Sequence, residues 1–123
     1  MILGVGIDLC EVARIAEMME KPQFLSRFFT AEEADYIVAR GKAGAESAAG
    51  IFAAKEAALK ALGTGLQGVA LADVGVAHLE SDAPYYALTG AARERMREMG
   101  GRTMHLSITH TGETAAAVAV LEG

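Results

Sequence analysis

The stretch "GIFAAKEAALKALGTG", residues 50–65, decides the fold because it has the periodicity of a helix that ends in a glycine turn. Most of its side chains are apolar, and Gly63 stands where glycine commonly terminates a helix. We predict a helix that begins at Ser47 or a neighbouring residue and ends at Gly63. Three charged residues interrupt this apolar segment: Lys55, Glu56 and Lys60.

Glu56 has an unusual position on this predicted helix. At about 100° per residue, Phe52, Glu56, Leu59 and Gly63 fall on one stripe. One interpretation is a solvent-facing pair of Glu56 and Lys60, which would contribute only a few tenths of a kcal/mol. However, Phe52 and Leu59 should face the core, and a half-buried carboxylate is unfavourable unless it is paired or binds a metal.

Asp8 is a second carboxylate in an apolar setting, because it ends the predicted strand "ILGVGID". It could be an ordinary strand-end residue. If the helix packs on this strand, Asp8 and Glu56 converge. Two carboxylates without a histidine or cysteine pair suit Mg²⁺, which keeps several waters and takes phosphate oxygens as further ligands. Lys60 would then neutralise phosphate.

A third candidate element is "HLSITHT", residues 105–111, which reads as a strand. Alternation places His105, Ser107 and Thr109 on one face and Leu106, Ile108 and His110 on the other. A polar edge strand would explain the pattern. A nucleophilic Ser107 with either histidine lacks an acid at a recognisable spacing. We therefore favour phosphate contacts from His110 and Thr111.

The rest of the chain predicts a single α+β domain, residues 1–123, with a mainly antiparallel sheet and packed helices. A capping box of Thr30 and Glu33 predicts a helix start, and the "GKAGAES" segment predicts a flexible joint. The predicted order is β-α-α-α-β-β-α-β-β. Its other segments are a buried strand over 1–8, helices over 11–19 and 89–99, and strands over 74–79, 85–88, 103–110 and 114–121.

Composition excludes several classes of protein. The net charge of −5 disfavours broad nucleic-acid binding, and no apolar run reaches the roughly 20 residues of a membrane span. Cys10 is the only cysteine, so an internal disulfide and a thiolate metal cluster are excluded. The N-terminal segment has no targeting pattern, so we expect a cytoplasmic protein. The chain is rich in alanine and glycine, so its core would contain few large apolar side chains, and we expect oligomerisation to add stability.

Four segments together resemble the bacterial holo-[acyl-carrier-protein] synthases, which are small phosphopantetheinyl transferases. These segments are "GVGIDLCEVAR", "FFTAEE", "FAAKEAALKALGTG" and "HLSITHTGETAAAVAV", in family order from Gly4 to Val120. The resemblance implies a 4′-phosphopantetheinyl transferase-like fold and a homotrimer with active sites between neighbouring subunits. It also implies Mg²⁺-dependent transfer of 4′-phosphopantetheine from coenzyme A to a serine of apo acyl carrier protein. The other product would be adenosine 3′,5′-bisphosphate, and the reaction would support fatty acid biosynthesis.

The resemblance also implies roles for individual residues. The metal-binding acids of the family fall on Asp8 and Glu56, and its conserved lysine falls on Lys60. The three charges of the helix would thus hold a metal and a pyrophosphate, and the carrier serine would lose its proton to Glu56 or to a metal-bound water held by Asp8. The expected coenzyme A contacts are Lys60, Gly63, Thr64, Gly65, Ser107, His110 and Thr111.

Carrier docking would fall on the first helix. Arg14 matches a basic position of the family there, and Met18 lies four residues on, on the same face. One departure concerns the nucleotide: the family commonly has arginine where this chain has Ile51, so another cation such as Lys42 would replace it. Two other functions remain open, namely a Mg²⁺-dependent pyrophosphate hydrolase and a non-catalytic trimeric binding module.

Overall fold

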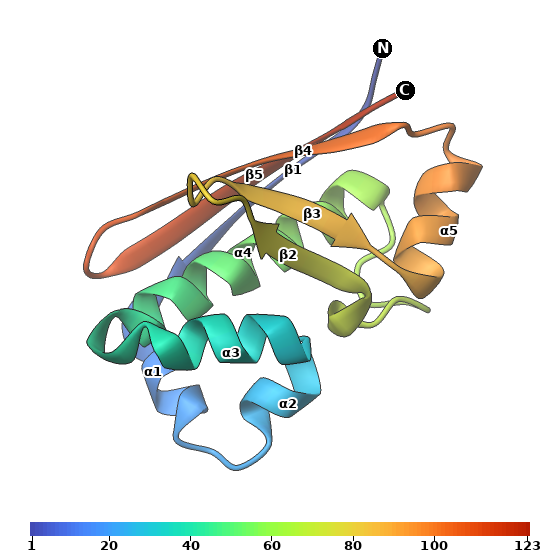
Figure 1. Ribbon diagram of the computed structural model, residues 1–123. Coiled ribbons are helices and arrows are strands. Elements are labelled where there is room, and N and C mark those ends of the chain that lie inside the picture. The colour runs from blue at the N-terminus through green and yellow to red at the C-terminus, as the bar shows by residue number, and fades with distance from the viewer.

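A computed structural model describes all residues, 1–123. Strands and helices form the α+β arrangement expected from the sequence (Figure 1). The strands are β1 (Ile2–Glu11), β2 (Val74–His78), β3 (Pro84–Leu88), β4 (Thr103–His110) and β5 (Thr114–Glu122). The α-helices are α1 (Val12–Met19), α2 (Phe24–Phe28), α3 (Ala31–Ala39), α4 (Gly44–Leu62) and α5 (Gly90–Glu98), with short 3₁₀ turns η1 (Gly41–Ala43) and η2 (Leu71–Asp73).

The strands form two antiparallel sheets. One has the order β1-β5-β4, and the other is the β2–β3 hairpin. In the first sheet Ala117 of β5 pairs with Asp8 of β1 on one side and with Ile108 of β4 on the other. The candidate residues of β1 and β4 therefore lie on opposite edges of this sheet, with β5 between them.

Helix α4 is central, since it lies between the three-stranded sheet and the layer formed by α3 and the β2–β3 hairpin (Figure 1). Its backbone comes very close to β1. A Cβ atom added at Gly4 would collide with the carbonyl of Ala61, and one added at Gly6 would collide with the carbonyl of Ala57. The two glycines allow the last turns of α4 to lie directly on the strand that carries Asp8.

The helices cover only one face of the three-stranded sheet. On the other face Val5, Ile7 and Leu9 of β1 are exposed, whereas Gly6 and Cys10 point inward and are buried. The prediction that β1 is buried is therefore wrong for its outer side chains. Alternation along the strand places every second residue on a face that no part of this chain covers.

Two local predictions about the helices are confirmed, and three features differ from the prediction. Thr30 and Glu33 form the predicted capping box, and Gly63 ends α4 with a φ of +73°. The "GKAGAES" joint is ordered instead: η1 occupies its start, and α4 begins at Gly44, three residues before Ser47. Helix α2 was missed because five residues are too few to show a helical period. No helix has the combination of length and apolar composition needed to cross a membrane.

Candidate active site

Lys60 and Asp8 meet where the end of α4 lies on β1. The Lys60 ammonium donates to Asp8 Oδ1 at 3.0 Å and to the carbonyl oxygen of Ile7 at 3.0 Å. The Lys60 side chain remains 55% exposed, whereas that of Asp8 is 20% exposed. Lys60 is therefore open to solvent and to a ligand while it is held against the strand.

Glu56 belongs to the same cluster. Burial raises the pKa of its carboxyl group, the negative charge of Asp8 raises it further, and the Lys60 ammonium opposes both effects. The side chain is half-buried, as its stripe on the helix predicted. The convergence of Asp8 and Glu56 that we expected if the helix packed on the strand is confirmed.

The residues present fit a magnesium ion. Their donors are the carboxylate oxygens of Asp8 and Glu56, hard ligands of the kind that Mg²⁺ prefers. Mg²⁺ is commonly bound through one or two carboxylates and completes its shell with water and substrate phosphate. A cation here would also relieve the repulsion between Asp8 and Glu56 that raises the pKa of Glu56.

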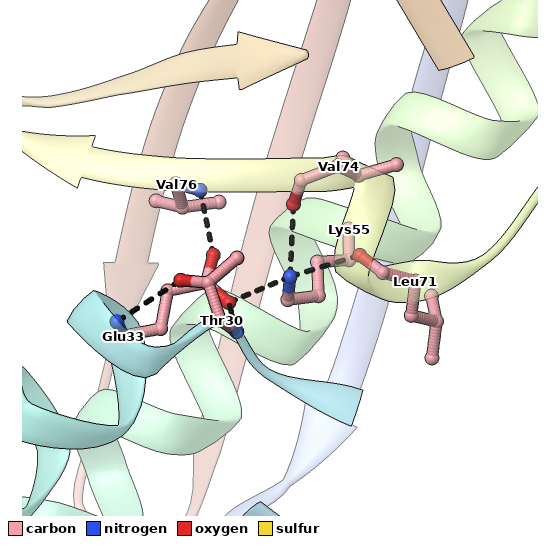
Figure 2. Close-up of polar contacts among 6 residues, drawn as sticks. All are labelled: Thr30, Glu33, Lys55, Leu71, Val74 and Val76. Atoms are coloured by element: carbon pink, nitrogen blue, oxygen red, sulfur yellow. Dashed lines mark hydrogen bonds and ion pairs between the residues drawn. The ribbon is translucent and has the colours of Figure 1, made fainter. Parts of the chain in front are cut away.

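Lys55 does not belong to this cluster, so the expectation that all three charges of the helix hold metal and pyrophosphate is wrong. Its ammonium is fully buried and pairs with Glu33 Oε1 at 2.7 Å on the side of α4 that faces α3 and β2 (Figure 2). Adjacent residues of a helix point about 100° apart, so Lys55 and Glu56 face different neighbours. Periodicity gives this angle but does not identify the element that packs on each side.

His110 lies in a second cluster, at the β4 edge. Its Nδ1 is 3.4 Å from Glu46 Oε2, and it lines a cavity of about 170 Å³ between α3, α4 and the β2–β3 turn. Ile51 lines the same cavity, so the position where the family commonly has arginine does face it. The cation beside it is Arg40, not Lys42, which is absent from the lining.

Sequence reasoning missed most residues of this cavity, among them Tyr36, Arg40 and His78. The Tyr36 ring stacks on His78 at 4.0 Å between centroids, and the Arg40 guanidinium lies 5.6 Å from the Tyr36 ring centroid. Tyr36 and Arg40 are four residues apart on a helical stretch, which is a signal for mutual contact. The contact with His78 depends on how the hairpin packs, and no local signal reveals it.

Ser107 and His110 point to opposite faces of β4, as the alternation predicted. Ser107 is exposed on the outer face, and His110 contacts Glu46 of α4 on the inner side. On the outer face His105 is paired with Glu122 at 2.9 Å. A pairing of Ser107 with His110 is therefore excluded within one chain.

The β4–β5 turn and the glycine turn after α4, which both carry expected coenzyme A contacts, differ in how accessible they are to a ligand. The Thr111 hydroxyl accepts hydrogen bonds from the amides of Glu113 and Thr114 at 3.2 and 3.1 Å, so it shapes the β4–β5 turn. By contrast, nothing lies within 4 Å of the position that a Cβ would take at Gly65. The backbone after α4 is thus accessible, as the "GTG" sequence predicted, whereas the Thr111 oxygen is already engaged.

The predicted site residues fall into two separate groups within one chain. Asp8, Glu56 and Lys60 lie at the β1 edge, and His110 lies at the β4 edge, on the far side of β5. Cys10 is buried, and its burial and the nearby Asp8 raise the pKa of its thiol. A thiol with a raised pKa is a poor nucleophile, which agrees with a packing role for Cys10.

Comparison with known proteins is consistent across the whole chain. A family model described as "4'-phosphopantetheinyl transferase superfamily" matches residues 4–119. A curated holo-[acyl-carrier-protein] synthase of Treponema denticola is 46% identical over 123 residues, covering 100% of both chains.

Solved structures agree in fold. The holo-[acyl-carrier-protein] synthase of Neisseria meningitidis aligns with a TM-score of 0.90 at 32% identity, covering 100% of both chains. The Bacillus anthracis synthase, solved in complex with CoA (3',5'-ADP), aligns with a TM-score of 0.84 at 35% identity over 100% of this chain and 98% of that one. The chain therefore belongs to the 4′-phosphopantetheinyl transferase superfamily, among the holo-[acyl-carrier-protein] synthases, and is a transferase.

Proposed function

We propose that residues 1–123 form one domain that transfers 4′-phosphopantetheine from coenzyme A to a serine hydroxyl of apo acyl carrier protein, in a Mg²⁺-dependent reaction. The other product would be adenosine 3′,5′-bisphosphate, and the cytoplasmic reaction would serve fatty acid biosynthesis. The observation that carries the proposal is the convergence of Asp8, Glu56 and Lys60 at the contact of α4 with β1.

Each residue of this cluster has a chemical task. Asp8 and Glu56 would hold Mg²⁺, which when bound offsets charge on the pyrophosphate and polarises the phosphorus under attack. The Lys60 ammonium, more than half exposed, can turn from Asp8 to the leaving phosphate and stabilise the charge that develops there. A carboxylate of this cluster, Glu56 directly or Asp8 through a water, is placed to take the proton of the carrier serine.

Coenzyme A would bridge the two groups of predicted residues. The cavity at His110 and Arg40 offers cationic and aromatic groups for the nucleotide, and the open backbone at 63–65 borders the end of α4. A substrate cannot reach both edges of one sheet directly across its face. A homotrimer in which the β4 edge of one subunit approaches the β1 edge of the next would bring the groups together.

The exposed apolar face of the sheet supports such an assembly. Val5, Ile7 and Leu9 of β1 lie beside the partly exposed Val118 and Val120 of β5. A contiguous exposed apolar patch on a sheet is typical of a surface that another chain covers. We propose that copies of this chain cover it, with Ser107 of β4 facing the same interface.

Carrier docking would use α1. Arg14 is exposed and has no ion-pair partner within 4.0 Å, and Met18 is partly exposed four residues further along the helix. Acyl carrier proteins are acidic, so an unpaired arginine beside an apolar side chain offers both steering and contact area. This surface lies next to the end of β1, close to Asp8 in the sequence.

Mass spectrometry of apo acyl carrier protein tests the proposal. Incubation with the enzyme, coenzyme A and Mg²⁺ should add one phosphopantetheine group per carrier and release adenosine 3′,5′-bisphosphate. Release of that nucleotide without a gain of carrier mass would identify a pyrophosphate hydrolase instead. Calorimetric binding of coenzyme A with neither product would leave only a binding module. A carrier whose acceptor serine is replaced by alanine is the matched control.

A further inference from the structure

The buried pair of Lys55 and Glu33 connects four segments of the chain. The three protons of the Lys55 ammonium meet Glu33 Oε1 at 2.7 Å and the carbonyl oxygens of Leu71 and Val74 at 3.0 and 2.9 Å (Figure 2). Both side chains have 0% exposure. Every donor of the ammonium is therefore used, and each acceptor belongs to a different part of the layer opposite the sheet.

Glu33 is equally engaged. Its Oε1 also accepts from the amide of Thr30 at 2.8 Å, and its Oε2 accepts from the amide of Val76 at 2.6 Å. The carboxylate thus closes the capping box of α3, holds β2 and receives the lysine of α4 at once. A buried pair with this many satisfied hydrogen bonds is rigid, because loss of any one contact would leave a charged or polar group without a partner.

Small side chains form much of the remaining buried surface of α4, beside the larger Ile51, Leu59 and Leu62. Its buried side chains include the seven alanines 48, 49, 53, 54, 57, 58 and 61. Alanine allows close approach but forms shallow ridges, so alanine contacts alone resist rotation of the helix about its axis only weakly. Among the buried side chains of α4, Lys55 is the one that directional hydrogen bonds and an ion pair fix at its tip, so it contributes strongly to setting this rotation.

We infer that Glu33 and Lys55 are positioning residues: by setting the rotation of α4, they hold Glu56 and Lys60, which both lie on this helix, in place beside Asp8 of β1. The inference rests on the proposed role of Glu56. A helix has an outer radius of about 5 Å, so a rotation of about 10° moves a side-chain tip by about 1 Å. A misplacement of this size in a catalytic constellation lowers rates by about 10²-fold.

The test is a mutant cycle between the buried pair and Glu56. Lys55→Met alone would leave the Glu33 charge unpaired in the core and destabilise the fold, so the paired variant Glu33→Gln/Lys55→Met is used. It should fold, yet lose about 10- to 100-fold in kcat/KM. A rotation of α4 displaces Lys60 as well as Glu56, so the cycle is measured in a Lys60→Ala background. There, adding the paired variant to Glu56→Gln should cause no further loss beyond about twofold, because it can act only through Glu56.

Two further measurements separate positioning from general destabilisation. Ile37→Ala, which creates a cavity beneath α3, is the matched control. Any loss of kcat/KM that it causes should multiply with the loss caused by Glu56→Gln. Mn²⁺ alone is titrated by electron paramagnetic resonance. It should bind the paired variant about tenfold more weakly than it binds the parent protein. It should bind the Ile37→Ala protein with the same affinity as the parent.

Contrary results would be clear. Native kcat/KM and Mn²⁺ affinity in the paired variant, with Glu56→Gln inactive, would overturn the inference and leave the proposed function standing. Losses that multiply in the Lys60→Ala background would assign the pair to stability alone. Full activity and Mn²⁺ affinity in Glu56→Gln would overturn both the inference and the proposed metal site.

Discussion

Lys60 donates to Asp8 across the contact of α4 with β1, and not to Glu56 one helical turn before it. The lysine thus joins two segments 52 residues apart in the chain. The Asp8–Lys60 pair leaves Glu56 half-buried without a salt bridge, and the pKa of its carboxyl group is raised. The local interpretation, a solvent-facing pair of Glu56 and Lys60, is therefore wrong.

Asp8→Asn and Glu56→Gln should be strongly non-additive in kcat. If both carboxylates hold one Mg²⁺, either substitution removes most of the effect of the site, and the double variant is little slower than the worse single variant. Steady-state rates of carrier modification at saturating Mg²⁺ measure this. Losses that multiply in the double variant would argue for two independent roles.

Lys60→Ala should lower kcat by about 10²-fold, the effect of losing one preorganised electrostatic donor. The melting temperature should change little, because an ion pair with a 55% exposed lysine contributes at most about 1 kcal/mol. Lys60→Arg should recover only part of the rate, since a planar guanidinium does not replace a compact ammonium. A near-normal kcat in Lys60→Ala would reduce this lysine to a structural partner of Asp8.

The pKa of Glu56 should respond oppositely to its two charged neighbours. Asp8→Asn removes a negative charge and should lower the Glu56 pKa, whereas Lys60→Met removes a positive charge and should raise it. A folded-state pKa above the unfolded value means that the folded protein binds more protons. The contribution of Glu56 to stability therefore falls as the pH rises from its pKa in the unfolded chain to its higher pKa in the folded protein. Carbon-detected NMR titration without metal measures the shifts, and shifts of the same sign in both variants would contradict the arrangement.

Arg14→Glu should raise the apparent KM for acyl carrier protein by about tenfold and leave coenzyme A binding nearly unchanged. The reversed charge weakens encounter with an acidic partner, and the difference should shrink with added salt. Arg93→Glu on α5 is a suitable control, because Arg93 is also exposed but lies on a helix remote from α1 (Figure 1). Equal damage to both substrates by Arg14→Glu would instead place Arg14 at the nucleotide.

Val5→Glu should convert the proposed trimer into monomers, because a charge on the outer face of β1 would be buried in the assembly. Val38→Glu on α3 is a matched control. Val5 and Val38 are 59% and 67% exposed in the single chain, yet only Val5 lies on the uncovered sheet. Light scattering at micromolar concentration measures the mass. A parent protein that is already an active monomer would refute the trimer itself.

Local patterns in the sequence were sufficient for most of the fold. The capping box at Thr30, the glycine stop at Gly63 and the alternation of residues 103–110 each depend on neighbours within a few positions. Of the two roles of Glu33, only the cap was accessible in this way. Its cap is encoded three residues away, but its pairing with Lys55 joins residues 22 positions apart through tertiary packing.

The same limit applies to the candidate site. Helical spacing distinguished Glu56 from its neighbours, and the convergence with Asp8 followed from a single packing assumption. The division of the site between two sheet edges depends on the strand order β1-β5-β4, which sequence spacing does not determine. For the same reason Arg40 was overlooked as a cation beside Ile51, since the two meet only in the folded chain.

The central position of α4 has a consequence for local unfolding. Because this helix contacts the three-stranded sheet, the β2–β3 hairpin and α1, α3 and α5, it cannot open without disrupting most of the molecule. Its amides should therefore exchange with solvent hydrogen only through global unfolding, whereas α1 and α2, at the periphery, can open at lower free energy. Glu56 and Lys60 lie on the most persistent element, and Arg14 lies on one that can yield. If α1 docks the carrier as proposed, its surface can adapt to the partner while Glu56 and Lys60 stay fixed.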